Sequence, residues 1–126
     1  MIIGTGIDII EIDRIEKAIQ RDKFVKRVFT VKEQEYCNSR GIQRAASYAA
    51  RFAGKEAILK AFGTGLVGGE LLDIEILPND KGCPKVSLTG FFSEYAALLE
   101  VSDIHITLTH ARLYAAANVI LWGGKK

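Results

Sequence analysis

The stretch RFAGKEAILKAFGTG (residues 51–65) predicts the end of a long helix that runs into a glycine-rich loop. We expect this helix over residues 42–62, with its end at Gly63. At about 100° per residue, one face carries an apolar stripe formed by Ala45, Tyr48, Ala49, Phe52 and Leu59. Glu56 falls inside that stripe, and Lys60 lies one turn later at its edge. The helix therefore carries an acid on the face that should pack against the core.

Two interpretations of Glu56 are open. An i,i+4 pair with Lys60 is worth only about 0.2–0.5 kcal/mol, which is too little to draw a carboxylate into an apolar stripe. A hard divalent cation is the better match, because Mg²⁺ binds one or two carboxylates together with substrate phosphates. Lys60 would then reach the same phosphates as a charge partner or proton donor.

A second acid stands on an apolar face near the N-terminus. In a strand expected over residues 2–12, one face carries Ile2, Gly4, Gly6, Asp8, Ile10 and Ile12. The two glycines predict open volume beside Asp8, where a metal ion carrying phosphates would fit. The alternative is a buried aspartate paired to arginine or to backbone amides, because a charge among isoleucines needs a partner.

His110 is the third polar residue on an apolar face. The segments DIHITLTH and LYAAANVILW predict a hairpin that turns at Ala111–Arg112, and His110 continues the row of Ile104, Ile106 and Leu108. Taken alone, such a histidine is typical of a satisfied core group. Together with Asp8 and Glu56 it completes a set of two carboxylates for a metal and one base near neutral pH.

Shorter elements are expected around the long helix. The predicted ranges are a helix from Asp13 to about Asp22, helices over 23–29, 31–39 (capped by Thr30) and 90–100, and strands over 71–77 and 85–88. Because helices and strands mix without a strict βαβ rhythm, we predict an α+β fold. A mainly antiparallel sheet should pack on the long helix in a compact single domain, residues 1–126.

The composition narrows the class of protein. Hydrophobic residues make up 48% and charged residues 25%, as in soluble globular domains, and no apolar run is long enough to span a membrane. We interpret the two cysteines as reduced thiols of a cytoplasmic protein. The glycines of GTGLVG (63–68) follow a helix and precede a strand, so they are not a dinucleotide fingerprint. They suit the close approach of a bulky ligand.

Positive charge is concentrated in residues 14–27, which hold six basic and two acidic side chains in a chain of net charge +2. This concentration favours an acidic partner over general nucleic-acid binding. We expect neither nucleic acid nor a membrane as a partner.

Three segments resemble the holo-acyl-carrier-protein synthases, the short class of 4′-phosphopantetheinyl transferases. They are GTGIDIIEIDRI (4–15), RFAGKEAILKAFGTGL (51–66) and ITLTHARLYAAANVIL (106–121), and they cover the family's motifs in order. The resemblance implies the 4′-phosphopantetheinyl transferase fold and the transfer of 4′-phosphopantetheine from coenzyme A to a serine of apo-acyl carrier protein, which releases adenosine 3′,5′-bisphosphate. It further implies a magnesium-dependent cytoplasmic enzyme of fatty acid biosynthesis.

The resemblance also assigns roles to residues. Asp8 and Glu56 match the Mg²⁺ ligands, and Lys60 matches a lysine that contacts the coenzyme A phosphate. His110 matches a histidine beside the nucleotide. The remaining coenzyme A contacts implied are Arg51, Lys55, Gly63, Thr64, Gly65 and Pro84. Glu56, a water on the metal and His110 are all candidates for the base, and we favour Glu56 acting through water.

The family's partners complete the expectation. The helix after the first strand docks on the acidic carrier protein, and Arg14, Lys17 and Arg21 share one face of that helix at i, i+3 and i+7. The family assembles as a homotrimer with sites at subunit interfaces, which would let Asp8 and the long helix of one site come from different subunits. A metal-dependent phosphate hydrolase or cyclase, or a non-catalytic coenzyme-A-binding module, is the alternative.

Overall fold

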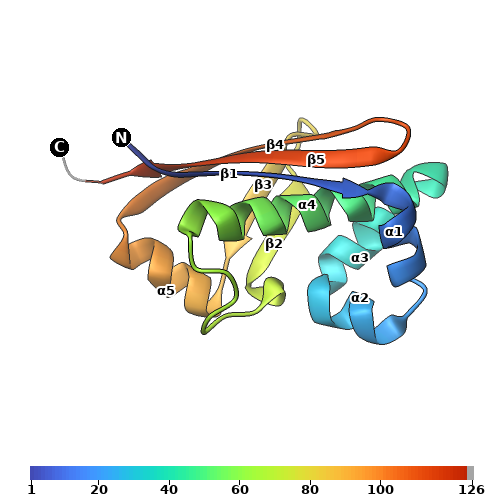
Figure 1. Cartoon of the computed structure of the whole chain (residues 1–126), viewed down its shortest axis with the longest axis horizontal. Coiled ribbons are helices and arrows are strands. Elements are labelled where there is room, and N and C mark those ends of the chain that lie inside the picture. The colour runs from blue at the N-terminus through green and yellow to red at the C-terminus, as the bar shows by residue number, and fades with distance from the viewer. Residues whose placement is uncertain (125–126) are drawn as a thin grey trace.

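Helix α4 (Arg44–Phe62) forms the centre of the molecule and lies against one face of a three-stranded sheet (Figure 1). The computed structural model describes residues 1–124. Most side chains of α4 are buried, because the sheet, the N-terminal helices and a second sheet contact it from several sides. Gly63 ends the helix with a φ of 76°, and its N–H donates to the carbonyls of Leu59 and Lys60. The predicted helix end is confirmed.

The main sheet has the strand order β1–β5–β4, and both pairings are antiparallel. Its strands are β1 (Ile2–Glu11), β4 (Val101–His110) and β5 (Tyr114–Gly123). Small side chains of β5, such as Ala115 and Ala117, are buried on the face that meets α4. The predicted β4–β5 hairpin is confirmed.

The opposite face of the main sheet is open. Figure 1 views the sheet nearly edge-on, with all the helices on one side of it. On the other side, Ile7 and Ile9 of β1 are 68% and 64% exposed, and Trp122 of β5 is 45% exposed. One face of the sheet is thus covered by the core and the other presents apolar side chains to solvent.

A second, two-stranded antiparallel sheet flanks α4, formed by β2 (Ile74–Pro78) and β3 (Pro84–Leu88). A short 3₁₀ turn, η2 (Leu71–Asp73), takes the first part of the strand predicted over 71–77. Helix α5 (Gly90–Leu98) follows β3. The α+β class and the antiparallel pairing are confirmed, with two sheets in place of one.

Three short helices precede α4, namely α1 (Ile12–Ala18), α2 (Asp22–Val28) and α3 (Val31–Asn38), and the 3₁₀ turn η1 (Gly41–Gln43) leads into α4. The predicted helix from Asp13 to Asp22 is too long, because the chain turns after Ala18 and starts α2 at Asp22. The predicted cap at Thr30 is confirmed, since its hydroxyl accepts from the N–H of Glu33 at 3.2 Å.

Candidate active site

Asp8, Glu56 and Lys60 come together where β1 packs on α4. The Lys60 ammonium lies 3.1 Å from Oδ1 of Asp8 and donates to the carbonyl of Ile7 at 3.0 Å. Glu56 precedes Lys60 by one helical turn and lies in the electrostatic field of both Asp8 and Lys60. A single chain supplies all three groups, so the expectation that Asp8 and the long helix belong to different subunits is wrong.

This cluster is accessible from solvent. The Lys60 side chain is 57% exposed and that of Asp8 is 16% exposed. Burial raises the pKa of the Glu56 carboxyl, and the negative charge of Asp8 raises it further, whereas Lys60 lowers it. Two carboxylates facing one ammonium leave an excess of negative charge, which favours the binding of a further cation.

The carboxylates of Asp8 and Glu56 fit a Mg²⁺ ion whose other ligands come from phosphates and water. Within residues 1–124 there is no group of three or more histidine, cysteine or acidic side chains that could hold a metal ion alone. Two carboxylates are, however, the usual protein contribution when phosphates and water supply the other ligands. Asp8 and Glu56 offer that contribution at an accessible surface.

Gly4 and Gly6 do not leave the open volume predicted beside Asp8. A β-carbon at Gly4 would overlap the carbonyl oxygen of Ala61, and one at Gly6 would overlap that of Ala57. The backbone of α4 therefore fills this space. The glycines allow β1 to approach α4 closely, and this approach brings Asp8 against the helix.

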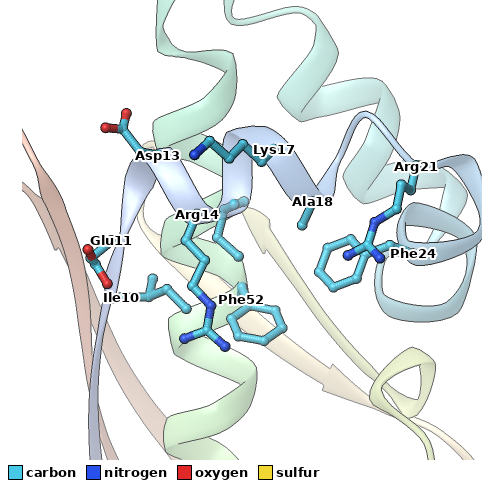
Figure 2. Close-up of a pocket in the computed structure, with 10 residues that line it drawn as sticks. Ile10, Glu11, Asp13, Arg14, Lys17, Ala18, Arg21, Phe24 and Phe52 are labelled. Atoms are coloured by element: carbon cyan, nitrogen blue, oxygen red, sulfur yellow. The ribbon is translucent and has the colours of Figure 1, made fainter.

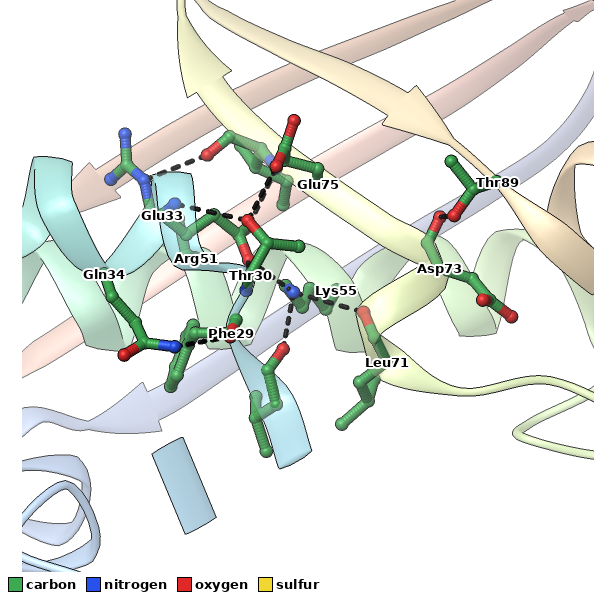
Figure 3. Close-up of polar contacts among 12 residues, drawn as sticks. Phe29, Thr30, Glu33, Gln34, Arg51, Lys55, Leu71, Asp73, Glu75 and Thr89 are labelled. Atoms are coloured by element: carbon green, nitrogen blue, oxygen red, sulfur yellow. Dashed lines mark hydrogen bonds and ion pairs between the residues drawn. The ribbon is translucent and has the colours of Figure 1, made fainter. Parts of the chain in front are cut away.

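Lys55 has no exposed surface, and this contradicts its predicted contact with coenzyme A. Its ammonium forms a 2.7 Å ion pair with Glu33 and donates to the carbonyls of Val28 at 2.6 Å and Leu71 at 3.1 Å (Figure 3). Burial lowers the pKa of Lys55, and the charge of Glu33 opposes this change. Lys55 fastens α4 to the end of α2, to α3 and to η2, so its role is structural.

Arg51 is also engaged inside the fold. Only 6% of the residue is exposed, and its guanidinium donates to the carbonyls of Ile76 at 3.2 Å and Ser47 at 3.3 Å. The same group lies 4.5 Å above the ring of Tyr36. Its contact with coenzyme A stays a prediction, and it would require Arg51 to leave these partners.

Glu33 is the important residue that the sequence reasoning missed. It is fully buried, and besides Lys55 it accepts from the backbone N–H of Thr30 at 2.9 Å and of Ile76 at 2.8 Å. The spacing Thr-x-x-Glu at residues 30–33 is a capping box, and this signal was available from the sequence. It indicates the helix start but does not reveal the partner on α4.

The other residues predicted near the nucleotide lie outside β1 and α4, the two elements that carry Asp8, Glu56 and Lys60. His110 is the exposed last residue of β4, and β5 separates that strand from β1. Gly63, Thr64 and Gly65 form the loop that leaves α4. Pro84 begins β3 and lines a cavity of about 400 Å³ together with residues of β4 and β5. These contacts stay predictions.

Arg14, Lys17 and Arg21 border one pocket of about 650 Å³ (Figure 2). They do not share one helix, because α1 ends at Ala18 and Arg21 directly precedes α2. Figure 2 shows Arg14 beside Phe52 and Arg21 beside Phe24. The rings of Phe24 and Phe52 lie 6.0 Å apart, so the pocket combines an aromatic wall with three basic residues and two acidic ones, Glu11 and Asp13.

Within residues 1–124, we find no helix with the length and apolar character that a bilayer crossing requires.

Comparisons with known proteins indicate one family over nearly the whole chain. The family model described as the 4′-phosphopantetheinyl transferase superfamily matches residues 4–117. A holo-[acyl-carrier-protein] synthase from Ruminiclostridium cellulolyticum is 46% identical over 124 residues, which cover 96% of this chain and 91% of that protein.

Solved structures agree as well. A holo-(acyl-carrier-protein) synthase from Bacillus anthracis, in complex with CoA (3′,5′-ADP), is 36% identical with a TM-score of 0.82, over 98% of this chain and 99% of that chain. The corresponding protein from Helicobacter pylori, in complex with coenzyme A, is 30% identical with a TM-score of 0.82, over 94% and 99% of the two chains.

Proposed function

The chain belongs to the 4′-phosphopantetheinyl transferase superfamily, and from this premise we propose that it transfers the 4′-phosphopantetheine arm of coenzyme A to a serine of apo-acyl carrier protein. The serine oxygen attacks the phosphorus that bears the pantetheine arm. The bond from this phosphorus to the bridging oxygen breaks, and adenosine 3′,5′-bisphosphate leaves. The observation that carries the proposal is the accessible cluster of Asp8, Glu56 and Lys60, in a chain whose relatives include synthases solved with coenzyme A.

Asp8 and Glu56 are the residues that would hold Mg²⁺. The ion would supply charge neutralisation for the pyrophosphate, which is the main need of phosphoryl transfer. Lys60 adds a second positive charge from the same helix, and its ammonium can protonate the leaving phosphate oxygen. Positioning and electrostatics then account for the chemistry without a covalent enzyme intermediate.

Glu56 is our choice for the group that accepts the serine proton, through one water molecule. Its carboxylate would lie beside any water bound to the metal, and in the metal-free chain burial and the neighbouring Asp8 raise its pKa. His110 lies on a strand that does not neighbour β1 in the same chain, so it is the weaker candidate unless another subunit supplies it.

The pocket bordered by Arg14, Lys17 and Arg21 is the proposed docking site for the acidic carrier protein. Its basic residues outnumber its acidic ones and suit carboxylates, and the rings of Phe24 and Phe52 suit an apolar side chain of the partner. Since an acyl carrier protein is the acceptor, we place the reaction in fatty acid biosynthesis in the cytoplasm.

A homotrimer with shared sites completes the proposal. The open sheet face exposes Ile7, Ile9 and Trp122, and apolar patches of this kind mark interaction surfaces. A neighbouring subunit would supply the nucleotide contacts, His110 among them, that one chain keeps apart from Asp8. Mixing Asp8→Asn with His110→Ala subunits tests this arrangement, because mixed trimers should recover activity that neither parent has.

Intact-mass spectrometry tests the function itself. Apo-acyl carrier protein incubated with the chain, coenzyme A and Mg²⁺ should gain the mass of phosphopantetheine, and EDTA should prevent the gain. The variants Asp8→Asn and Glu56→Gln, checked for folding by circular dichroism, serve as matched controls. Release of adenosine bisphosphate without a mass gain on any carrier would support a hydrolase, and no reaction at all would support a coenzyme-A-binding module.

A further inference from the structure

Lys60 is hydrogen-bonded to Asp8, which is one of the two proposed metal ligands. Its ammonium donates to Asp8 at 3.1 Å and to the Ile7 carbonyl at 3.0 Å, so it neutralises one of the two carboxylates proposed to bind Mg²⁺. We propose that Lys60 is a built-in counter-cation for Asp8 that metal binding displaces, which frees the lysine for the phosphates of coenzyme A. This inference rests on the proposed metal site and goes beyond it.

Competition follows from the chemistry of the carboxylate. The Lys60 ammonium takes one oxygen of this carboxylate, Oδ1, and its positive charge repels a divalent ion bound to either oxygen at short range. The Lys60–Asp8 pair is also easy to open. Exposed pairs of this kind contribute little to stability, and 57% of the Lys60 side chain already faces solvent.

Displacement removes Asp8 as a partner of Lys60 and leaves the ammonium with the carbonyl of Ile7 alone. Its long side chain stays anchored on α4 one turn after Glu56, beside the place where the phosphates would lie. An anionic phosphate can then replace Asp8 as its partner. Metal and coenzyme A should therefore strengthen each other's binding, and this coupling must be reciprocal.

Lysine-selective NMR on ¹⁵N-labelled protein tests the displacement without measuring activity. In metal-free protein, the ¹⁵Nζ resonance of Lys60 is assigned by its loss in Lys60→Met. Saturating Mg²⁺ should shift or abolish that signal, whereas the Lys55 signal should not change, because its three acceptors are internal. A Lys60 signal that stays unchanged while the backbone amides of β1 report bound metal would overturn the inference and leave the metal site intact.

Binding of Mn²⁺, followed by electron paramagnetic resonance, supplies the second test. Without coenzyme A, Lys60→Met should bind Mn²⁺ about two- to fivefold more tightly than the unmodified chain, as expected when an exposed competing pair is removed. Lys17→Met removes the same charge from the basic pocket and should leave the affinity unchanged. Equal or weaker binding by Lys60→Met overturns the inference. If Asp8→Asn binds Mn²⁺ as well as the unmodified chain, the proposed metal site itself fails, and the inference fails with it.

Discussion

Lys55 and Lys60 stand five residues apart on helix α4, and each forms an ion pair with a carboxylate from another element. The Lys55–Glu33 pair measures 2.7 Å and has no exposed side-chain surface. The Lys60–Asp8 pair measures 3.1 Å, with exposed fractions of 57% and 16%. The chemistry of the two pairs is the same, and the surroundings differ.

Burial separates their roles. Around this pair, Lys55 also donates to backbone carbonyls and Glu33 also accepts from backbone N–H groups, so the pair links five segments: α4, α2, α3, η2 and β2. Around Lys60, solvent and an additional acid, Glu56, leave room for a change of partner. One helix thus carries a buried pair that holds segments together and an exposed pair for which we propose a role in the chemistry.

The largest expected effect is on stability. Lys55→Met should lower the free energy of unfolding by about 3–5 kcal/mol, because it leaves the Glu33 carboxylate buried without its counter-charge. Lys60→Met should change it by at most about 1 kcal/mol, because that pair is exposed. Urea unfolding of the two variants measures both values. Similar losses would show that burial does not distinguish the pairs.

Substitutions in the exposed Asp8 cluster should affect activity much more than stability. Asp8→Asn and Glu56→Gln should each reduce phosphopantetheine transfer by about 100- to 1000-fold, the usual result of removing a group that stabilises charge in the transition state. Both variants should keep the fold, because these side chains lie at the edge of the core. Intact-mass assays at saturating Mg²⁺ give the rates. Substantial transfer by either variant would contradict the metal assignment.

The same contrast explains what the sequence could predict. Asp8, Glu56 and Lys60 were identifiable because charged residues on apolar faces violate the expected periodicity. The role of Lys55 was not, because its partner Glu33 lies 22 residues earlier and meets it only through tertiary packing.

Other differences have similar physical reasons. The β4–β5 hairpin and the end of α4 depend on local patterns, and both were predicted well. Gly6 was misjudged because a sequence shows a missing side chain but not the helix backbone that fills the space. His110 lies on β4, the strand predicted to carry it. Contacts between two copies of a chain leave no pattern in the sequence of one copy, so the sequence could not indicate whether His110 meets Asp8 of another subunit.

The pocket bordered by Arg14, Lys17 and Arg21 is also exposed, and we propose that it binds the carrier protein. Arg14→Ala should raise the KM for apo-carrier protein about three- to tenfold and leave the KM for coenzyme A nearly unchanged, because Arg14 borders the pocket and not the Asp8 cluster. Steady-state kinetics at two salt concentrations should show a weaker salt dependence for the variant. Equal changes in both KM values would argue against docking at α1.

The smallest expected effect is that of Glu56 ionisation on the free energy of unfolding. Because burial and Asp8 raise the pKa of Glu56 in the folded chain, the native state holds its proton more tightly than the unfolded state does. This protonation favours the fold at low pH, and the benefit is lost as pH rises from about 4.5 through the folded pKa. Glu56→Gln should therefore be slightly more stable than the unmodified chain at neutral pH, and the gain should vanish below pH 4.5. Unfolding curves at several pH values in EDTA measure this difference. A variant less stable at neutral pH would place Glu56 with Lys55 and Glu33, among the residues that hold the fold together.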